Sequence, residues 1–187
     1  MRLFVAINLP DAVRRRVWDA TASLRSAALP VRWGQPEGLH VTLKFLGEVA
    51  ADRERELTDA VRACVAGVRP FSVGIAGCGA VPTAARPRVV WIGCEASPPL
   101  ELLQDRVERA MNALGYPNEG RVFRPHLTLG RARRDARSPA FAGFDALAAE
   151  VIVDEVFTVT SVDLMRSVLG RAGARYERLF AAELETF

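Results

Sequence analysis

Apolar and polar residues alternate along two short segments of the chain, 40–46 and 126–130. The first reads His-Val-Thr-Leu-Lys-Phe-Leu and the second reads His-Leu-Thr-Leu-Gly. A period of two is typical of a strand with one buried face. The chain contains 2 histidines in all, and each begins one of these segments. The pattern therefore predicts two matched strands, each presenting an imidazole and a hydroxyl on one face.

The alternation also predicts which side chains share a face. In the first strand it places Lys44 on the face of His40 and Thr42, and Phe45 on the opposite, aliphatic face. We therefore expect Phe45 to serve the core in preference to stacking on a nucleobase. Lys44, in contrast, is expected near any group that His40 contacts.

Strand and helix periods follow one another along the rest of the chain. We expect further strands at residues 2–8, 71–78, 88–94 and 176–184, and a β-rich stretch at 151–168. We expect helices with an apolar stripe at residues 11–28, 51–67 and 98–114, and a turn at 170–173. This order predicts an α+β fold in which the two histidine motifs occupy equivalent positions in two halves of the chain.

Length and composition fit one globular domain covering residues 1–187. Hydrophobic residues make up 50% of the sequence and charged residues 25%. No apolar run approaches the ~20 residues that span a bilayer. The apolar run at the N-terminus is too short for a signal peptide and ends at Asn-Leu-Pro. We therefore expect a cytoplasmic protein without a membrane partner.

The residues that commonly hold metals or cofactors form no recognisable motif. The 3 cysteines include no Cys-x-x-Cys pair, which argues against a zinc site and a disulfide framework, so we expect free thiols. There is no third histidine, no carboxylate cluster at ligand spacing, no P-loop and no Gly-x-Gly-x-x-Gly. We expect no metal and no cofactor.

Basic residues concentrate just after the second histidine strand. The net charge is only +3, but residues 131–137 are rich in arginine and contain one acid, Asp135. Two interpretations stay open: a solvated loop, or a rim that attracts phosphate groups. Trp33 is similarly ambiguous between a stacking platform and core packing.

Two matched His-Thr pairs suit reactions at phosphorus. An imidazole titrates near pH 6.5, so one can remove a proton while the other donates one. Threonine hydroxyls are short, rigid donors for phosphoryl oxygens. A single histidine in a strand is commonly structural, but the repeat of the whole motif favours function. A Ser-His-Asp triad needs only one histidine.

The two motifs resemble those of the two-histidine (2H) phosphoesterases. Within that superfamily the chain is similar to the RNA 2',3'-cyclic phosphodiesterases, also called 2'-5' RNA ligases. The similarity extends to residues 2–7, 167–170 and 173–176. It implies a bilobal fold with pseudo-twofold symmetry, two antiparallel-sheet lobes with outer helices, and a central cleft. It also implies metal-independent opening of RNA or nucleoside 2',3'-cyclic phosphates to 2'-phosphomonoesters, with reverse 2'-5' ligation allowed. We expect the protein to act as a monomer.

The resemblance assigns roles to individual residues. His40 and His126 match the catalytic histidines, and Thr42 and Thr128 match the phosphate-binding hydroxyls. We provisionally take His40 as the acid for the 3' leaving oxygen and His126 as the base for water, although the sequence leaves the reverse open. Position beside the motifs, and not the resemblance, makes Arg131, Lys44 and Phe45 candidate substrate-binding residues.

Two rival functions remain open. One is a binding module of the same fold that holds an RNA end or nucleotide without turnover. The other is a phosphodiesterase acting on a different cyclic phosphate, such as an ADP-ribose cyclic phosphate. A purely structural role leaves the matched motifs unexplained.

Overall fold

The computed structural model describes residues 1–170 and 173–186. The strands are β1 (Arg2–Asn8), β2 (Val31–Trp33), β3 (His40–Glu48), β4 (Phe71–Thr83), β5 (Arg86–Cys94), β6 (His126–Ala132), β7 (Asp154–Val159), β8 (Ser161–Gly170) and β9 (Gly173–Glu183). The α-helices are α1 (Asp11–Ala20), α2 (Ala22–Ser26), α3 (Glu54–Val65), α4 (Pro98–Ala113) and α5 (Phe144–Ala149). Short 3-10 turns lie at Pro36–Gly38, Ala51–Arg53 and Ser138–Phe141.

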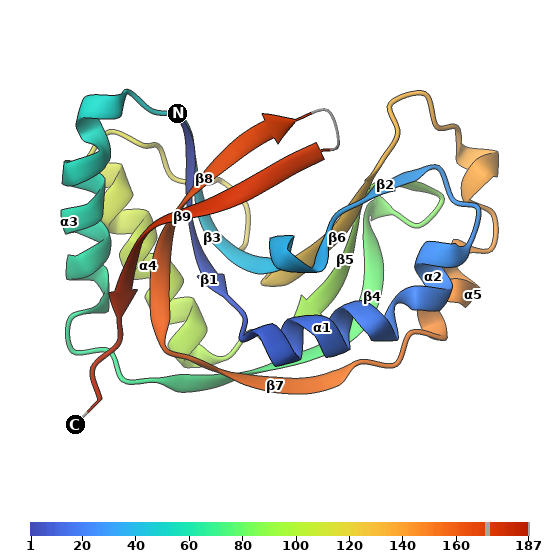
Figure 1. Cartoon of the computed structure of the whole chain (residues 1–187), viewed down its shortest axis with the longest axis horizontal. Coiled ribbons are helices and arrows are strands. Elements are labelled where there is room, and N and C mark those ends of the chain that lie inside the picture. Colours follow the sequence, from blue (N-terminus) through green and yellow to red (C-terminus); the bar gives the residue numbers. More distant parts are fainter. Residues whose placement is uncertain (171–172, 187) are drawn as a thin grey trace.

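Within the described residues, the 9 strands form one antiparallel sheet in the order β7-β4-β5-β6-β3-β1-β8-β9, with β2 paired to β6. The two histidine strands, β3 and β6, are neighbours at its centre. Apart from β2, three more strands lie on each side of this central pair. The sheet is curled, and the predicted α+β class is confirmed (Figure 1).

The helices lie outside the curled sheet in two groups (Figure 1). Helices α3 and α4 pack on each other, and they contact the half that contains β3 and β8. The predicted apolar stripe of α4 is buried: Leu100, Leu103, Val107 and Met111. Helices α1 and α5 contact β7 and β4 of the other half, and α2 contacts α5. Over the described residues, no helix is both long and apolar enough to cross a membrane.

Several predicted boundaries were wrong. The helix expected at 11–28 is interrupted at Thr21, whose hydroxyl donates to the carbonyl of Trp18 at 2.7 Å. Strand β4 continues to Thr83, beyond the expected end at residue 78. The short elements β2 and α5 were not anticipated. Residues 171 and 172 of the turn expected at 170–173 lie outside the described part of the chain.

A β-bulge changes the phase of the first histidine strand. Thr42 pairs with Ala6 and Lys44 with Val5, so Leu43 is an extra residue without a partner on β1. Beyond Leu43 the side chains therefore exchange faces. Lys44 is buried at 1% exposure and Phe45 is 54% exposed. The sequence-based placement of Lys44 on the histidine face and of Phe45 in the core was wrong.

The second histidine strand has the same irregularity at the same step. Thr128 pairs with Trp91 and Gly130 with Val90, so Leu129 is the extra residue. Gly130 is buried, and Arg131 is exposed. Gly130 thus corresponds to Lys44, and Arg131 to Phe45. The repeat therefore extends beyond the His-Thr pair to a shared bulge.

Gly130 allows β2 to lie close against β6. A β-carbon at this position would come within 2.7 Å of Val31 and 2.9 Å of Trp33. Trp33 is half-buried and packs on the core. This contact supports the core-packing interpretation of Trp33.

The three cysteines are free, as predicted. Cys64 is buried, whereas Cys78 and Cys94 are half-buried. Burial raises the pKa of the Cys94 thiol to about 12. These thiols are therefore protonated at neutral pH and are poor nucleophiles.

Candidate active site

The register of the sheet brings the two histidine motifs together. Val41 of β3 pairs with Leu127 of β6 in antiparallel orientation. This register sets His40 opposite Thr128, and Thr42 opposite His126. Because Val41 and Leu127 are buried in the core, the two His-Thr pairs occupy the other face of the sheet. The two histidine strands are thus neighbours, with both His-Thr pairs on one face of the sheet.

His40 is packed between aromatic rings. Its ring centroid lies 4.8 Å from that of Phe4 on β1 and 4.8 Å from that of Tyr176 on β9. The ring of Tyr176 stands edge-on to both His40 and Phe4. Gly38 makes room for this arrangement, because a β-carbon there would approach the Tyr176 ring to 3.3 Å. These contacts hold the imidazole in one orientation.

Burial lowers the pKa of His40 to about 4. Desolvation is the largest cause, and the charges of Arg14, His126 and Arg131 lower the pKa further. A backbone hydrogen bond with Gly38 opposes these effects. His40 is therefore neutral at pH 7 in the free protein.

This low pKa predicts a pH-dependent stability. The unfolded chain binds a proton at His40 near pH 6.5, whereas the folded protein binds it only near pH 4. Stability from this group is thus present above pH 6.5 and is lost as the pH falls toward 4. We expect the free energy of unfolding to fall by about 3 kcal/mol more in the wild type than in His40→Phe over this interval.

Urea denaturation at several pH values measures this difference. The phenyl ring of His40→Phe keeps the aromatic packing and removes the titration. Parallel pH profiles for the two proteins would contradict a lowered pKa at His40.

His126 is oriented by a backbone carbonyl. Its Nδ1 lies 2.7 Å from the carbonyl oxygen of Arg124. A carbonyl can only accept, so Nδ1 carries a proton and Nε2 is the nitrogen available for proton transfer. His40 is likewise bonded to the backbone two residues before it, at Gly38. Both motifs therefore orient their imidazoles in the same way.

Two arginines lie near His40. Arg131 emerges from β6 just after the second bulge, and its charge reaches His40. Arg14 comes from α1, where its Nη1 forms an ion pair with Oδ1 of Asp11 at 2.9 Å. Its side chain is mostly buried, and its Nε has no hydrogen-bond partner within the described residues. The two guanidinium groups make this region attractive to an anion.

Lys44 does not belong to this face. Its Nζ donates to Oε2 of Glu108 on α4 at 2.8 Å and to the carbonyl of Pro117 at 2.5 Å. The assignment of Lys44 as a candidate substrate-binding residue is therefore corrected, because the bulge turns it into the core. Phe45 takes the position that Lys44 was expected to fill. Its ring centroid lies 6.1 Å from that of Phe4.

Sequence reasoning missed the residues that support His40 from other strands. Phe4 and Tyr176 enclose the imidazole, and Asn8 pairs with His40 across β1 and β3. Asn8 donates to the fully buried carboxylate of Asp163 at 2.6 Å. Asn8 could have been identified from the sequence, because it is a polar residue at the end of the apolar strand β1. Among the described residues, no group of three or more His, Cys, Asp or Glu is placed to hold a metal ion.

A protein-family model described as the 2'-5' RNA ligase superfamily matches residues 9–171. A protein of Methanothermobacter thermautotrophicus named RNA 2',3'-cyclic phosphodiesterase is 34% identical over 176 residues, covering 94% of this chain and 95% of its own length. The Escherichia coli protein of the same name is 32% identical over 185 residues, covering 95% and 93% respectively.

Solved structures show the same fold over nearly the whole chain. TT0787 of Thermus thermophilus matches with a TM-score of 0.78 and 27% identity, covering 98% of both chains. LigT of E. coli, crystallised with 3'-AMP, matches with a TM-score of 0.75 and 27% identity, covering 99% of this chain and 98% of LigT. LigT has also been crystallised with ATP and with NADP+.

Proposed function

Because the chain belongs to the 2'-5' RNA ligase superfamily, we propose that it hydrolyses the 2',3'-cyclic phosphate at an RNA end to a 2'-phosphomonoester. The family membership confirms the resemblance that the two histidine motifs indicate. Relatives named RNA 2',3'-cyclic phosphodiesterase support this substrate. We assign the activity to one domain covering residues 1–187, with the two halves of the sheet acting as pseudo-symmetric lobes around a central cleft.

One observation carries the proposal: two imidazoles and two hydroxyls share one face across an antiparallel strand pair. A phosphorus atom between His40 and His126 can then be attacked from one side and released on the other. Water adds to phosphorus and gives its proton to one imidazole, while the 3' oxygen leaves and takes a proton from the other. The products are a 3'-hydroxyl and a 2'-phosphate. Neither step requires a metal ion.

The threonines and Arg131 serve the phosphate. Thr42 and Thr128 are half-buried beside the histidines and can donate to non-bridging oxygens. Their hydroxyls stabilise the charge that builds on the phosphoryl group during attack. Arg131 adds a positive charge close to His40. Phe45, which is exposed beside Phe4, offers a ring against which a base can stack.

The assignment of His40 as acid and His126 as base stays a prediction. His40 is neutral in the free protein at pH 7, so as the acid it must gain its proton together with the substrate. A bound phosphate anion favours this, because a nearby negative charge raises the pKa of an imidazole. By microscopic reversibility, the same groups can join a 5'-hydroxyl to the cyclic phosphate in a 2'-5' linkage.

The test uses purified protein in excess EDTA with an RNA oligonucleotide that ends in a 2',3'-cyclic phosphate. Phosphorus NMR is expected to show conversion to the 2'-phosphate, with no 3'-phosphate formed. A cyclic mononucleotide and an ADP-ribose cyclic phosphate run in parallel test the rival substrate classes. Bound but unchanged RNA would reject the proposal in favour of a binding module, and turnover of another cyclic phosphate alone would reassign the substrate.

A further inference from the structure

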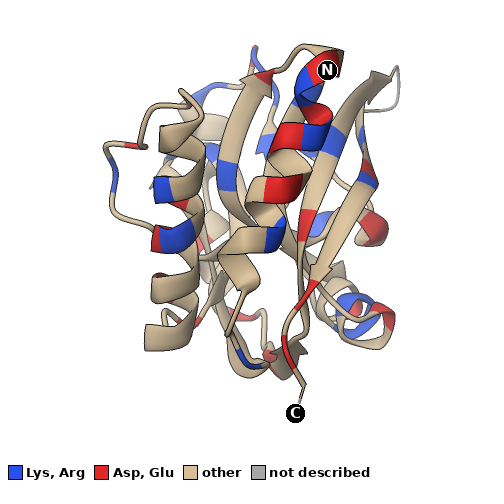
Figure 2. Cartoon of the chain, turned by 90° about the vertical axis from the view of Figure 1, so that its left-hand side faces the viewer, with Lys and Arg blue, Asp and Glu red and all other residues tan. Residues whose placement is uncertain are grey.

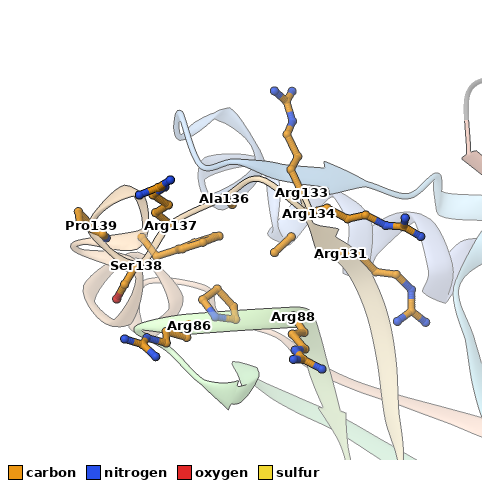
Figure 3. Close-up of a pocket in the computed structure, with 12 residues that line it drawn as sticks. Arg86, Arg88, Arg131, Arg133, Arg134, Ala136, Arg137, Ser138 and Pro139 are labelled. Atoms are coloured by element: carbon orange, nitrogen blue, oxygen red, sulfur yellow. The ribbon is translucent and has the colours of Figure 1, made fainter.

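Six arginines surround one cavity at the start of β5 and the end of β6. The cavity has a volume of about 800 Å³, and its lining includes no acidic residue. Its arginines are Arg86, Arg88, Arg131, Arg133, Arg134 and Arg137. In Figure 3, Arg131 and Arg134 lie at the β6 end and Arg86 and Arg137 on the far side, whereas Arg133 points away from the others. All six side chains are exposed.

These guanidinium groups are not neutralised by the protein. Within the described residues, none of the six side chains forms a hydrogen bond or an ion pair. Several arginines elsewhere are paired with acids: Arg16 lies 2.7 Å from Glu155, and Arg62 lies 2.8 Å from Asp59. Figure 2 shows acidic and basic residues mixed on the side of α3. Placing like charges around a cavity whose lining has no acid costs free energy, which a bound polyanion offsets.

Arg131 links the cavity to the candidate active site. This residue lines the cavity, and its charge also reaches His40. Its partner on β5, Val89, lies four residues from Gly93, the partner of His126, so about 13 Å separates the α-carbons of Arg131 and His126. An anion in the cavity is therefore a separate group from the one between the histidines, on the same extended ligand.

We propose that this arginine-lined cavity binds the backbone phosphates of RNA nucleotides that precede the terminal cyclic phosphate. The inference rests on the proposed function, which places the reacting phosphate between the histidines. The chain then continues away from that phosphate with one negative charge per nucleotide. Guanidinium groups suit this ligand because they bind phosphate oxygens through two parallel hydrogen bonds. The site therefore distinguishes an RNA end from a cyclic mononucleotide.

The test compares Arg134→Gln/Arg137→Gln with Arg62→Gln/Arg109→Gln. Both variants lose two positive charges, but the second pair lies away from the cavity, where each arginine is paired with an aspartate. The probes are an RNA of about six nucleotides ending in a 2'-phosphate and the matching nucleoside 2'-monophosphate. Fluorescence anisotropy gives the dissociation constant of the RNA, and competition against the RNA gives that of the nucleotide. Both are measured from 0.05 to 0.5 M salt, roughly the range over which contacts between arginine and phosphate are screened.

We expect Arg134→Gln/Arg137→Gln to weaken RNA binding on the order of tenfold at low salt and to make the salt slope shallower by about 1.4. The ratio of RNA affinity to nucleotide affinity should fall in this variant and not in the control. Equal behaviour of the two variants, or an unchanged slope, overturns the proposal. Arginine-dependent RNA binding without hydrolysis of the cyclic phosphate would support the cavity and reject the proposed function.

Discussion

Replacing His126 with alanine is expected to lower kcat/KM for the cyclic phosphate by about a thousandfold, and His40→Ala by a similar factor, because each removes a proton-transfer group. Both changes leave the main chain of the central strand pair intact. His126 holds its proton on Nδ1 against the carbonyl of Arg124, so Nε2 is the atom whose loss matters. Single-turnover rates at saturating enzyme separate the chemical step from binding.

The same variants reveal which histidine is the acid. A substrate with sulfur in place of the 3' bridging oxygen has a leaving group that departs without a proton. If His40 is the acid, His40→Ala should lose far less activity on this substrate, whereas His126→Ala should remain fully impaired. The opposite pattern would reverse the polarity.

Binding provides the control for both histidine variants. If both histidines are catalytic, each substitution should change the dissociation constant of the 2'-phosphate product much less than it changes the rate. Loss of product binding equal to the loss of rate would instead indicate a module that only holds the RNA end. Circular dichroism verifies that the variants are folded.

Replacing Lys44 with alanine is expected to lower the free energy of unfolding by about 3–5 kcal/mol. Lys44 is 1% exposed, and its partner Glu108 is 12% exposed. Removing the ammonium leaves a carboxylate in a low-dielectric site without its counter-charge. It also leaves the carbonyl of Pro117 without this donor. Urea denaturation at pH 7 measures the loss.

Two further variants isolate the cause. Lys44→Met/Glu108→Leu removes both charges and keeps the volume, so it should recover most of the stability. Arg62→Ala breaks an exposed pair with Asp59 and should cost less than about 1 kcal/mol. A double variant as unstable as Lys44→Ala would show that packing of the lysine stem, and not the orphaned charge, dominates.

The sequence predicted the two histidine strands because their alternation is regular up to the bulge. The sequence-based placement failed at Lys44 and Phe45 because the extra residue Leu43 exchanges the faces of the side chains that directly follow it, and the local residue types do not reveal such an insertion. A signal was available in Leu46, which is buried and would share the histidine face if the alternation were unbroken. An apolar residue on an otherwise polar face is a reason to suspect a bulge.

The supporting residues of the site could not be predicted from local patterns. Tyr176 reaches His40 from β9, far along the chain, and it does so through the pairing of β8 with β1 and β9. Arg14 lies in an ordinary amphipathic helix, and only the packing of α1 brings it near His40. Such contacts depend on strand order and helix placement, which the sequence constrains only weakly.

The matched bulges limit how the two central strands can be altered. An extra residue at the same step of both motifs decides which face each later side chain takes. The position after it serves a different purpose in each half, because Lys44 anchors α4 in one and Gly130 admits β2 in the other. Deleting one residue between the threonine and this position would therefore exchange the faces of the side chains that follow, in either strand.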